Sequence, residues 1–304
     1  MAATTRKKTK GSKRRAKEQI VGILFALPII LKYLIFMIGP MILSLYYSFT
    51  DYHVIGTTQW VGLENYGNLL KNADTFTYNS FKVTVLYVVL YVVLTNVLAY
   101  VLACAMVKRL RFRSLFRTVF YIPSVFPVVA SCFIFSWLLS PDMGVVNYFI
   151  KLFGGTAQKF LTGSTQVIPT LAVMSLWWSG MTMMIYLAGL QEIPSQLYEA
   201  FKADGGTRLQ AHFSITIPLL TPTILVNLIT SVITGFQVFT QADIMTNGGP
   251  GNASNFVVYY IYNEAFGFFR FGKACAISWL LFLVIFMVIA VIFGSSGKWV
   301  HYSE

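Results

Sequence analysis

The chain has 304 residues, of which 56% are hydrophobic and only 11% are charged. Because soluble domains carry about 25% charged residues, this composition argues against a water-soluble globular fold and indicates a membrane protein. The net charge is +12, but eight of the 23 Lys and Arg residues lie among the first 17 residues, directly before an apolar stretch. We interpret this run as a cytosolic topology anchor rather than as an arm that binds nucleic acid.

Six segments are long and apolar enough to cross a membrane. The hydrocarbon core of a bilayer is about 30 Å thick, so a helix needs about 20 mostly apolar residues to span it. We therefore predict an all-α membrane protein with six transmembrane helices. The predicted spans are 20–48, 84–107, 118–139, 167–190, 219–240 and 274–295.

The distribution of basic residues predicts the orientation of these spans. If the N-terminus lies inside, the segments on its side of the membrane hold 16 Lys and Arg residues and the opposite side holds 6. By the positive-inside rule, both termini are expected in the cytosol. The K-R-L-R-F-R run at 108–113 indicates an inside loop independently of the tail. No Asp or Glu lies within the six spans, which argues against a proton- or sodium-coupled carrier.

One inside loop, 191–218, is longer and more polar than a simple connection requires. A helix is expected to begin near Pro194, because proline suits a first helical turn, and to end at Gly205, because glycine suits a left-handed cap. A second short helix is expected from Arg208 to about Ser214. Two short helices on the cytosolic surface would form a partly apolar knob of the kind that docks into another protein.

The insert carries a recognisable pattern. Glu199-Ala200-Phe201, Gly205 and the I-T-I-P of 215–218 resemble the EAA loop of binding-protein-dependent ABC importers, with every spacing kept. Phe201 stands where the family has a third small residue, and Gly206 stands where it often has Ala. Further stretches resemble the carbohydrate branch of that family: S-F-T-D-Y at 48–52, G-L-E-N-Y at 62–66, Y-I-P at 121–123, A-G-L-Q at 188–191, T-N-G-G-P at 246–250 and G-K-A at 272–274.

The resemblance implies the type-1 ABC importer transmembrane fold and a set of partners. These are a second, related permease subunit in a heterodimer, two ATP-binding subunits that use ATP and Mg, an extracytoplasmic sugar-binding protein, a sugar substrate and membrane lipid. The implied location is the prokaryotic inner membrane. The residues expected to couple the chain to the ATPase are Glu199, Ala200, Phe201, Asp204 and Gly205.

The resemblance also suggests a division of the chain. We expect a basic cytosolic tail at 1–18 and the first transmembrane helix with an external segment at 19–80. The transmembrane core would span 81–295 and include the coupling loop 191–218, and a cytosolic C-terminal tail would occupy 296–304.

The chain is expected to be non-catalytic. The stretch 267–274 superficially matches G-x-x-x-x-G-K, but Ala274 replaces the hydroxyl residue that would bind Mg²⁺, and three aromatic residues crowd the loop. The three histidines, His53, His212 and His301, are scattered, so we expect neither a metal site nor a cofactor bound by this chain.

A sugar needs hydrogen-bonding groups and flat apolar faces, so the substrate path is sought where aromatic residues lie beside amides or hydroxyls. The candidates in the fourth and fifth spans are Trp177, Trp178, Ser231, Thr234 and Gln237. For each of them, ordinary helix packing or an interfacial aromatic belt remains an alternative.

Two rival functions stay open at this stage. An importer of glycerol-phosphate-type ligands would need cationic groups along its path, and Lys32 is the one basic residue within the six spans. A secondary carrier or a channel would work without ATP.

Overall fold

The computed structural model describes residues 10–53, 56–71, 75–107 and 112–301. Parts of the predicted N-terminal tail (1–9), of the basic loop (108–111) and of the C-terminal tail (302–304) therefore lie outside the described residues. The main elements are α1 (Lys10–Tyr33), α2 (Gly39–Ser48), β1 (Thr50–Asp51), β2 (Gln59–Trp60), α3 (Glu64–Lys71), α4 (Thr75–Val107), α5 (Arg113–Tyr121), α6 (Val128–Leu138), α7 (Val145–Leu152), α8 (Val167–Ser175), α9 (Gly180–Glu192), α10 (Ser195–Ala203), α11 (Arg208–Ala211), α12 (Ile217–Phe236), α13 (Val257–Tyr262) and α14 (Phe271–Ser296). Short 3₁₀ or π-helical turns are η1 (Leu34–Ile38), η2 (Ile122–Val125), η3 (Leu176–Trp178), η4 (His212–Thr216), η5 (Ala242–Thr246) and η6 (Asn263–Gly267).

The predicted number of spans agrees with the structure. Among the described residues, four helices are long and apolar enough to cross a membrane unbroken, and two bent pairs of helices raise the number to six. The unbroken spans are Val21–Ser48, Thr77–Val107, Arg208–Phe236 and Phe271–Ser296.

The prediction that 118–139 and 167–190 are each a single helix is wrong, because both segments are bent. The first turns by 98° at Phe126 and Pro127, because a residue that precedes proline is driven out of the helical conformation. The second turns by 55° where η3 meets Gly180. A Cβ atom on Gly180 would overlap a backbone carbonyl of α5, so this bend depends on a close approach that only glycine allows.

Helix α4 lies at the centre of the bundle, where it contacts α8, α9, α12 and α13. It packs closely on α9 because Ala99 and Ala103, one turn apart, are fully buried against Met183 and Leu187. Small residues at such an interface let two helices approach, and close packing is what holds helices together in lipid. The seam between α4 and α9, extended by α12, is therefore the rigid centre of the fold.

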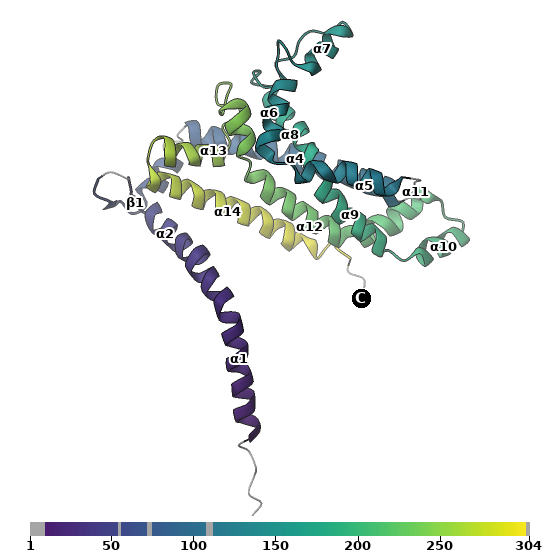
Figure 1. Cartoon of the computed structure of the whole chain (residues 1–304), viewed down its shortest axis with the longest axis horizontal. Helices are drawn as coiled ribbons and strands as arrows, with labels where there is room; N and C mark the ends of the chain where they lie inside the picture. The colour runs from purple at the N-terminus through teal and green to yellow at the C-terminus, as the bar shows by residue number, and fades with distance from the viewer. Residues whose placement is uncertain (1–9, 54–55, 72–74, 108–111, 302–304) are drawn as a thin grey trace, which may run out of the picture.

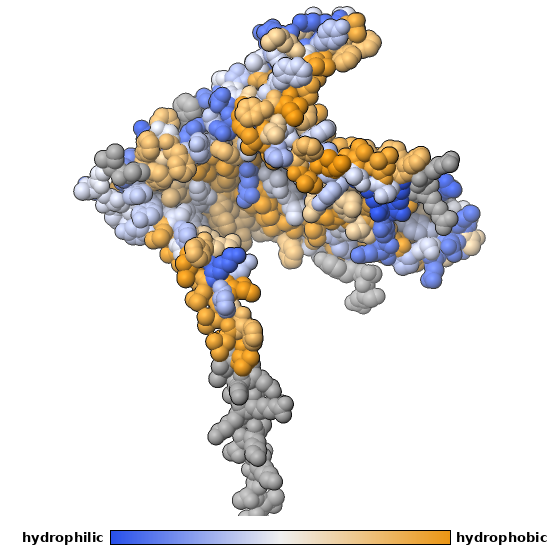
Figure 2. All heavy atoms as spheres, in the orientation of Figure 1, coloured by the Kyte–Doolittle hydropathy of each residue, from blue (hydrophilic) through white to orange (hydrophobic). Residues whose placement is uncertain are grey.

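The first span forms an arm, Val21–Ser48, that stands away from this bundle (Figure 1). No residue of its most apolar stretch is buried, and the part of the arm that is drawn in colour is mostly hydrophobic, with one hydrophilic patch (Figure 2). Only its last part, α2, packs on α14. A helix that exposes apolar side chains along most of its surface is stable in lipid or against another membrane protein.

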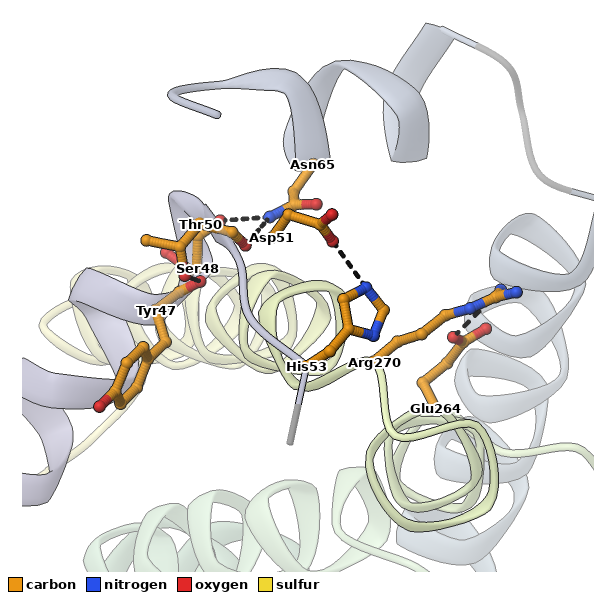
Figure 3. Close-up of polar contacts among 8 residues, drawn as sticks. All are labelled: Tyr47, Ser48, Thr50, Asp51, His53, Asn65, Glu264 and Arg270. Carbon is orange, nitrogen blue, oxygen red and sulfur yellow. Dashed lines mark hydrogen bonds and ion pairs between the residues drawn. The ribbon is translucent and has the colours of Figure 1, made fainter. Parts of the chain in front are cut away.

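The arm is joined to the bundle by a cap of hydrogen bonds at the end of α2 (Figure 3). The amide of Asn65 donates to the carbonyl oxygens of Ser48 and Thr50, each at 2.9 Å, and Tyr66 donates to Ser48 Oγ at 2.7 Å. A Cβ atom on Gly272 would overlap the carbonyl oxygen of Thr50, so α14 can approach only with glycine there. The stretches that meet in this cap are 48–52, 62–66 and 272–274.

A buried carboxylate ties α14 to the preceding turn beside the cap. The side chain of Glu264, in η6, is only 4% exposed, and it lies 2.8 Å from Lys273 Nζ. It also lies 3.8 Å from a nitrogen of Arg270 (Figure 3). Burial raises the pKa of Tyr260 to about 12, so its hydroxyl stays protonated and accepts a hydrogen bond from Lys273 at 2.8 Å. These partners compensate a carboxylate that would be costly to bury alone.

Candidate functional site

The 191–218 insert consists of two helices separated by a glycine corner. Helix α10 ends in a Schellman motif, in which Gly206 N donates to Phe201 O at 2.9 Å and Gly205 N donates to Lys202 O at 3.1 Å. Gly205 has φ +83°, a left-handed conformation that other residues rarely adopt. The predicted end of the first helix is therefore confirmed, together with its cause.

The second helix starts as predicted but does not end there. Thr207 and Gln210 form a capping box, in which the Gln210 side chain accepts from Thr207 N at 2.8 Å. The expected end at about Ser214 is wrong, because the helix continues through η4 into α12 as one segment from Arg208 to Phe236. Pro218 follows directly after the π-helical turn η4, so the segment passes through this proline without ending.

Four of the five residues expected to contact a partner lie on the exposed surface of the insert. Glu199, Ala200, Asp204 and Gly205 are exposed, whereas Phe201 is half-buried. The Phe201 ring covers Gly206 so closely that a Cβ atom there would overlap it. The bulky Phe201 and the second glycine, two departures from the EAA pattern, therefore compensate each other, and Phe201 supports the corner instead of projecting outward.

Polar contacts hold the insert against the spans. The hydroxyls of Tyr198, on α10, and Thr216, in η4, lie 2.9 Å apart. With its amide oxygen directed at α5, Gln191 accepts hydrogen bonds from Arg113 and Arg117, each at 2.6 Å. These contacts connect both ends of the insert to the bundle, so a force on its exposed face would reach the spans.

A second candidate site is a cavity of about 310 Å³ among α4, α6, η3 and the end of α12. Its lining consists of Tyr87, Tyr91, Val128, Ser175, Trp178, Thr234, Gln237, Val238, Phe239, Thr240 and Gln241. Aromatic faces, hydroxyls and amides alternate there, and no charged side chain is among them. The indole nitrogen of Trp178 is buried and has no hydrogen-bond partner. This wall can therefore donate to and stack against a neutral, hydroxyl-rich molecule.

The structure separates the five residues expected along the substrate path. Trp178, Thr234 and Gln237 line this cavity together. Trp177 lies in a different, apolar hollow and is 46% exposed. Its ring meets the Phe135 ring edge-on, with the ring centroids 5.6 Å apart. Ser231 is 4% exposed and packs between helices.

Sequence reasoning missed the contribution of α4 to the cavity. Tyr87 and Tyr91 are stacked with ring centroids 5.7 Å apart, and Tyr87 Oη lies 2.8 Å from Ser175 Oγ. Their spacing of four residues was the available signal, since it places both rings on one face of a helix. Among the described residues, no group of His, Cys, Asp and Glu side chains is suited to a metal ion.

Known proteins resemble this chain over nearly its whole length. YesP of Bacillus subtilis (strain 168), a probable ABC transporter permease protein, is 34% identical over 97% of this chain and 96% of its own. The trehalose/maltose transport system permease protein MalF of Thermococcus litoralis is 30% identical over 90% of this chain and 92% of its own.

The fold agrees with a solved ABC transporter. A chain of the bacterial alginate ABC transporter, crystallised in complex with alginate pentasaccharide-bound periplasmic protein, matches 93% of this chain and 96% of its own with a TM-score of 0.83 and 24% identity. This confirms the predicted type-1 importer fold. Residues 95–301 match the family model of the binding-protein-dependent transport system inner membrane component. The chain therefore belongs to this family of multi-pass membrane permeases.

Proposed function

We propose that the chain is the non-catalytic, membrane-spanning permease subunit of an ATP-driven importer of neutral sugars. The observation that carries this proposal is the cavity lined by Trp178, Thr234 and Gln237 on the same spans that bear the exposed insert. The same chain thus holds a cavity suited to a ligand and an exposed insert suited to docking an ATPase.

The chemistry of the cavity supports a neutral sugar, such as an oligosaccharide. Indole and phenol rings cover the C–H faces of a pyranose, while amides and hydroxyls bind its hydroxyl groups. A phosphate or carboxylate ligand would call for a cation, and no charged side chain lines the cavity. The similarity to a trehalose/maltose permease favours the same substrate class.

The insert supports coupling to a partner ATPase. Glu199, Ala200 and Asp204 form its exposed face, and Gly205 forms its corner. We propose that two ATP-binding subunits dock there and use ATP and Mg, and that a second, related permease completes the pathway. An extracytoplasmic binding protein would deliver the sugar. The distribution of basic residues supports a prokaryotic inner-membrane location with both termini in the cytosol.

Co-purification with mass spectrometry, followed by ATPase assays, tests the proposal. The purified complex is expected to contain a second permease and an ATPase, and its ATP hydrolysis is expected to rise with binding protein and neutral oligosaccharides. Uronate oligosaccharides and glycerol phosphate serve as anionic controls and should not stimulate hydrolysis. A complex without an ATPase would refute the coupling, and stimulation by the anionic ligands alone would refute the neutral substrate class.

A further inference from the structure

A cluster of polar side chains, two buried and one half-buried, lies at the seam of α4, α9 and α12. Tyr186 donates to Asn96 Oδ1 at 2.8 Å, and the amide of Asn96 donates to Ser231 Oγ at 3.1 Å. Tyr186 is 2% exposed and Ser231 is 4% exposed. We call Asn96, Tyr186 and Ser231 the amide cluster. Because buried polar groups are costly unless paired, these hydrogen bonds hold the three spans in one arrangement.

The amide cluster continues toward the insert through Tyr100. This residue lies one turn beyond Asn96 on α4, and its ring meets the ring of Tyr186 edge-on with centroids 5.7 Å apart. Its hydroxyl lies 3.0 Å from Nε2 of His212, and the two rings are also 5.7 Å apart. His212 belongs to η4, the turn that joins the insert to α12. Side chains in contact thus run from the insert into the middle of the bundle.

The contact between Tyr100 and His212 is placed to transmit movement. His212 follows directly after α11, so a displacement of the insert carries this imidazole with it. Without the hydrogen bond, α11 and η4 would still continue into α12, but they would lose this direct polar link to α4. Interfaces held by discrete hydrogen bonds switch between arrangements instead of deforming smoothly.

We propose that Tyr100 and His212 are positioning residues that pass movement of the insert to α4 and to the amide cluster. This proposal rests on the proposed function, in which the insert is the ATPase docking surface. Neither residue lines the sugar cavity, so both act through the residues that they hold in place.

The test uses the complete reconstituted complex with its ATPase, second permease and binding protein. The variants are Tyr100→Phe, His212→Phe and the double variant, which remove the hydrogen bond but keep the rings. His212→Gln, which can still bond to Tyr100, should restore function. Tyr66→Phe is the matched control, because it removes a tyrosine hydroxyl contact that lies in the cap and not between the insert and α4. The readout is the number of sugar molecules transported per ATP, with ATPase co-purification as the assembly check.

Each single substitution is expected to lower the transport ratio by about 2- to 10-fold, the range of one net hydrogen bond. The double variant should lose no more than either single variant, because the two residues act as one unit. Full transport ratios in both single variants, or independent losses that multiply in the double variant, would overturn the proposal. If the complex with Tyr100→Phe does not assemble, the transport ratios of His212→Phe and His212→Gln are compared instead. Equal ratios in these two variants would then overturn the proposal. A wild-type complex without sugar-stimulated hydrolysis would instead refute the proposed function.

Discussion

The corner of the insert at Gly205 provides a sharp prediction, because a substitution there changes the backbone conformation without creating a steric clash. Gly205 has φ +83°, and a Cβ atom placed there would meet no atom within 4 Å. A substitution at Gly205 therefore acts through the backbone alone. A left-handed conformation costs an ordinary L-residue about 1–2 kcal/mol, and more for a β-branched side chain. This corresponds to about a 5- to 30-fold loss of the correctly folded corner.

The comparison that isolates this effect is Gly205→Val with Gly205→Asn, because asparagine tolerates the left-handed region. We expect Gly205→Val to weaken binding of the ATPase and to reduce sugar-stimulated ATP hydrolysis by about the same factor of 5 to 30. Gly205→Asn should remain close to wild type. Both would be measured on reconstituted complexes at matched amounts of permease. If valine is tolerated as well as asparagine, or if asparagine is as harmful as valine, the conformation of Gly205 does not determine coupling.

Three further predictions follow from specific contacts. Gly206→Ala should reduce ATPase binding because its Cβ atom overlaps the Phe201 ring and also meets the backbone oxygen of Phe201. Adding Phe201→Ala removes the ring but not the backbone oxygen and should therefore restore binding in part; a double variant no better than the single one would contradict this. Trp178→Phe removes the unpartnered indole donor and should raise the KM for sugar by about 2- to 10-fold. Trp177→Phe should leave the KM unchanged. Equal effects of the two substitutions would show that the sugar path lies on another face of the spans. Asn65→Ala removes two hydrogen bonds to the end of the arm and should destabilise the complex in thermal unfolding by about 1–3 kcal/mol, and an unchanged unfolding temperature would mean that the cap does not hold the arm.

Features with a local cause could be predicted from the sequence. The end of α10 follows from Gly205, since a left-handed cap favours glycine whatever surrounds it. The six apolar segments follow from the thickness of a bilayer. The stretches that resemble the importer family gain a structural explanation in the cap, where Asn65 and Gly272 join segments that are far apart in the chain.

Features that depend on packing could not be predicted. Hydropathy gives the length of an apolar segment but not its direction, so the sequence predicts a continuous span where the chain in fact bends at Pro127. Trp177 and Trp178 are neighbours of the same type, yet only Trp178 faces the cavity. Ser231 carries a hydroxyl suited to sugar but uses it to pair with Asn96. The face that each side chain presents is set by the neighbouring helices, which a single sequence does not specify.

Uptake of labelled neutral oligosaccharide into proteoliposomes is the most direct test of the central claim. The vesicles would contain the complete complex, with binding protein on the cap side and nucleotide on the side of the insert. We predict uptake with hydrolysable MgATP and none with a non-hydrolysable analogue or with a proton or sodium gradient. Uptake by this chain alone, driven by an ion gradient without ATP, would contradict the account.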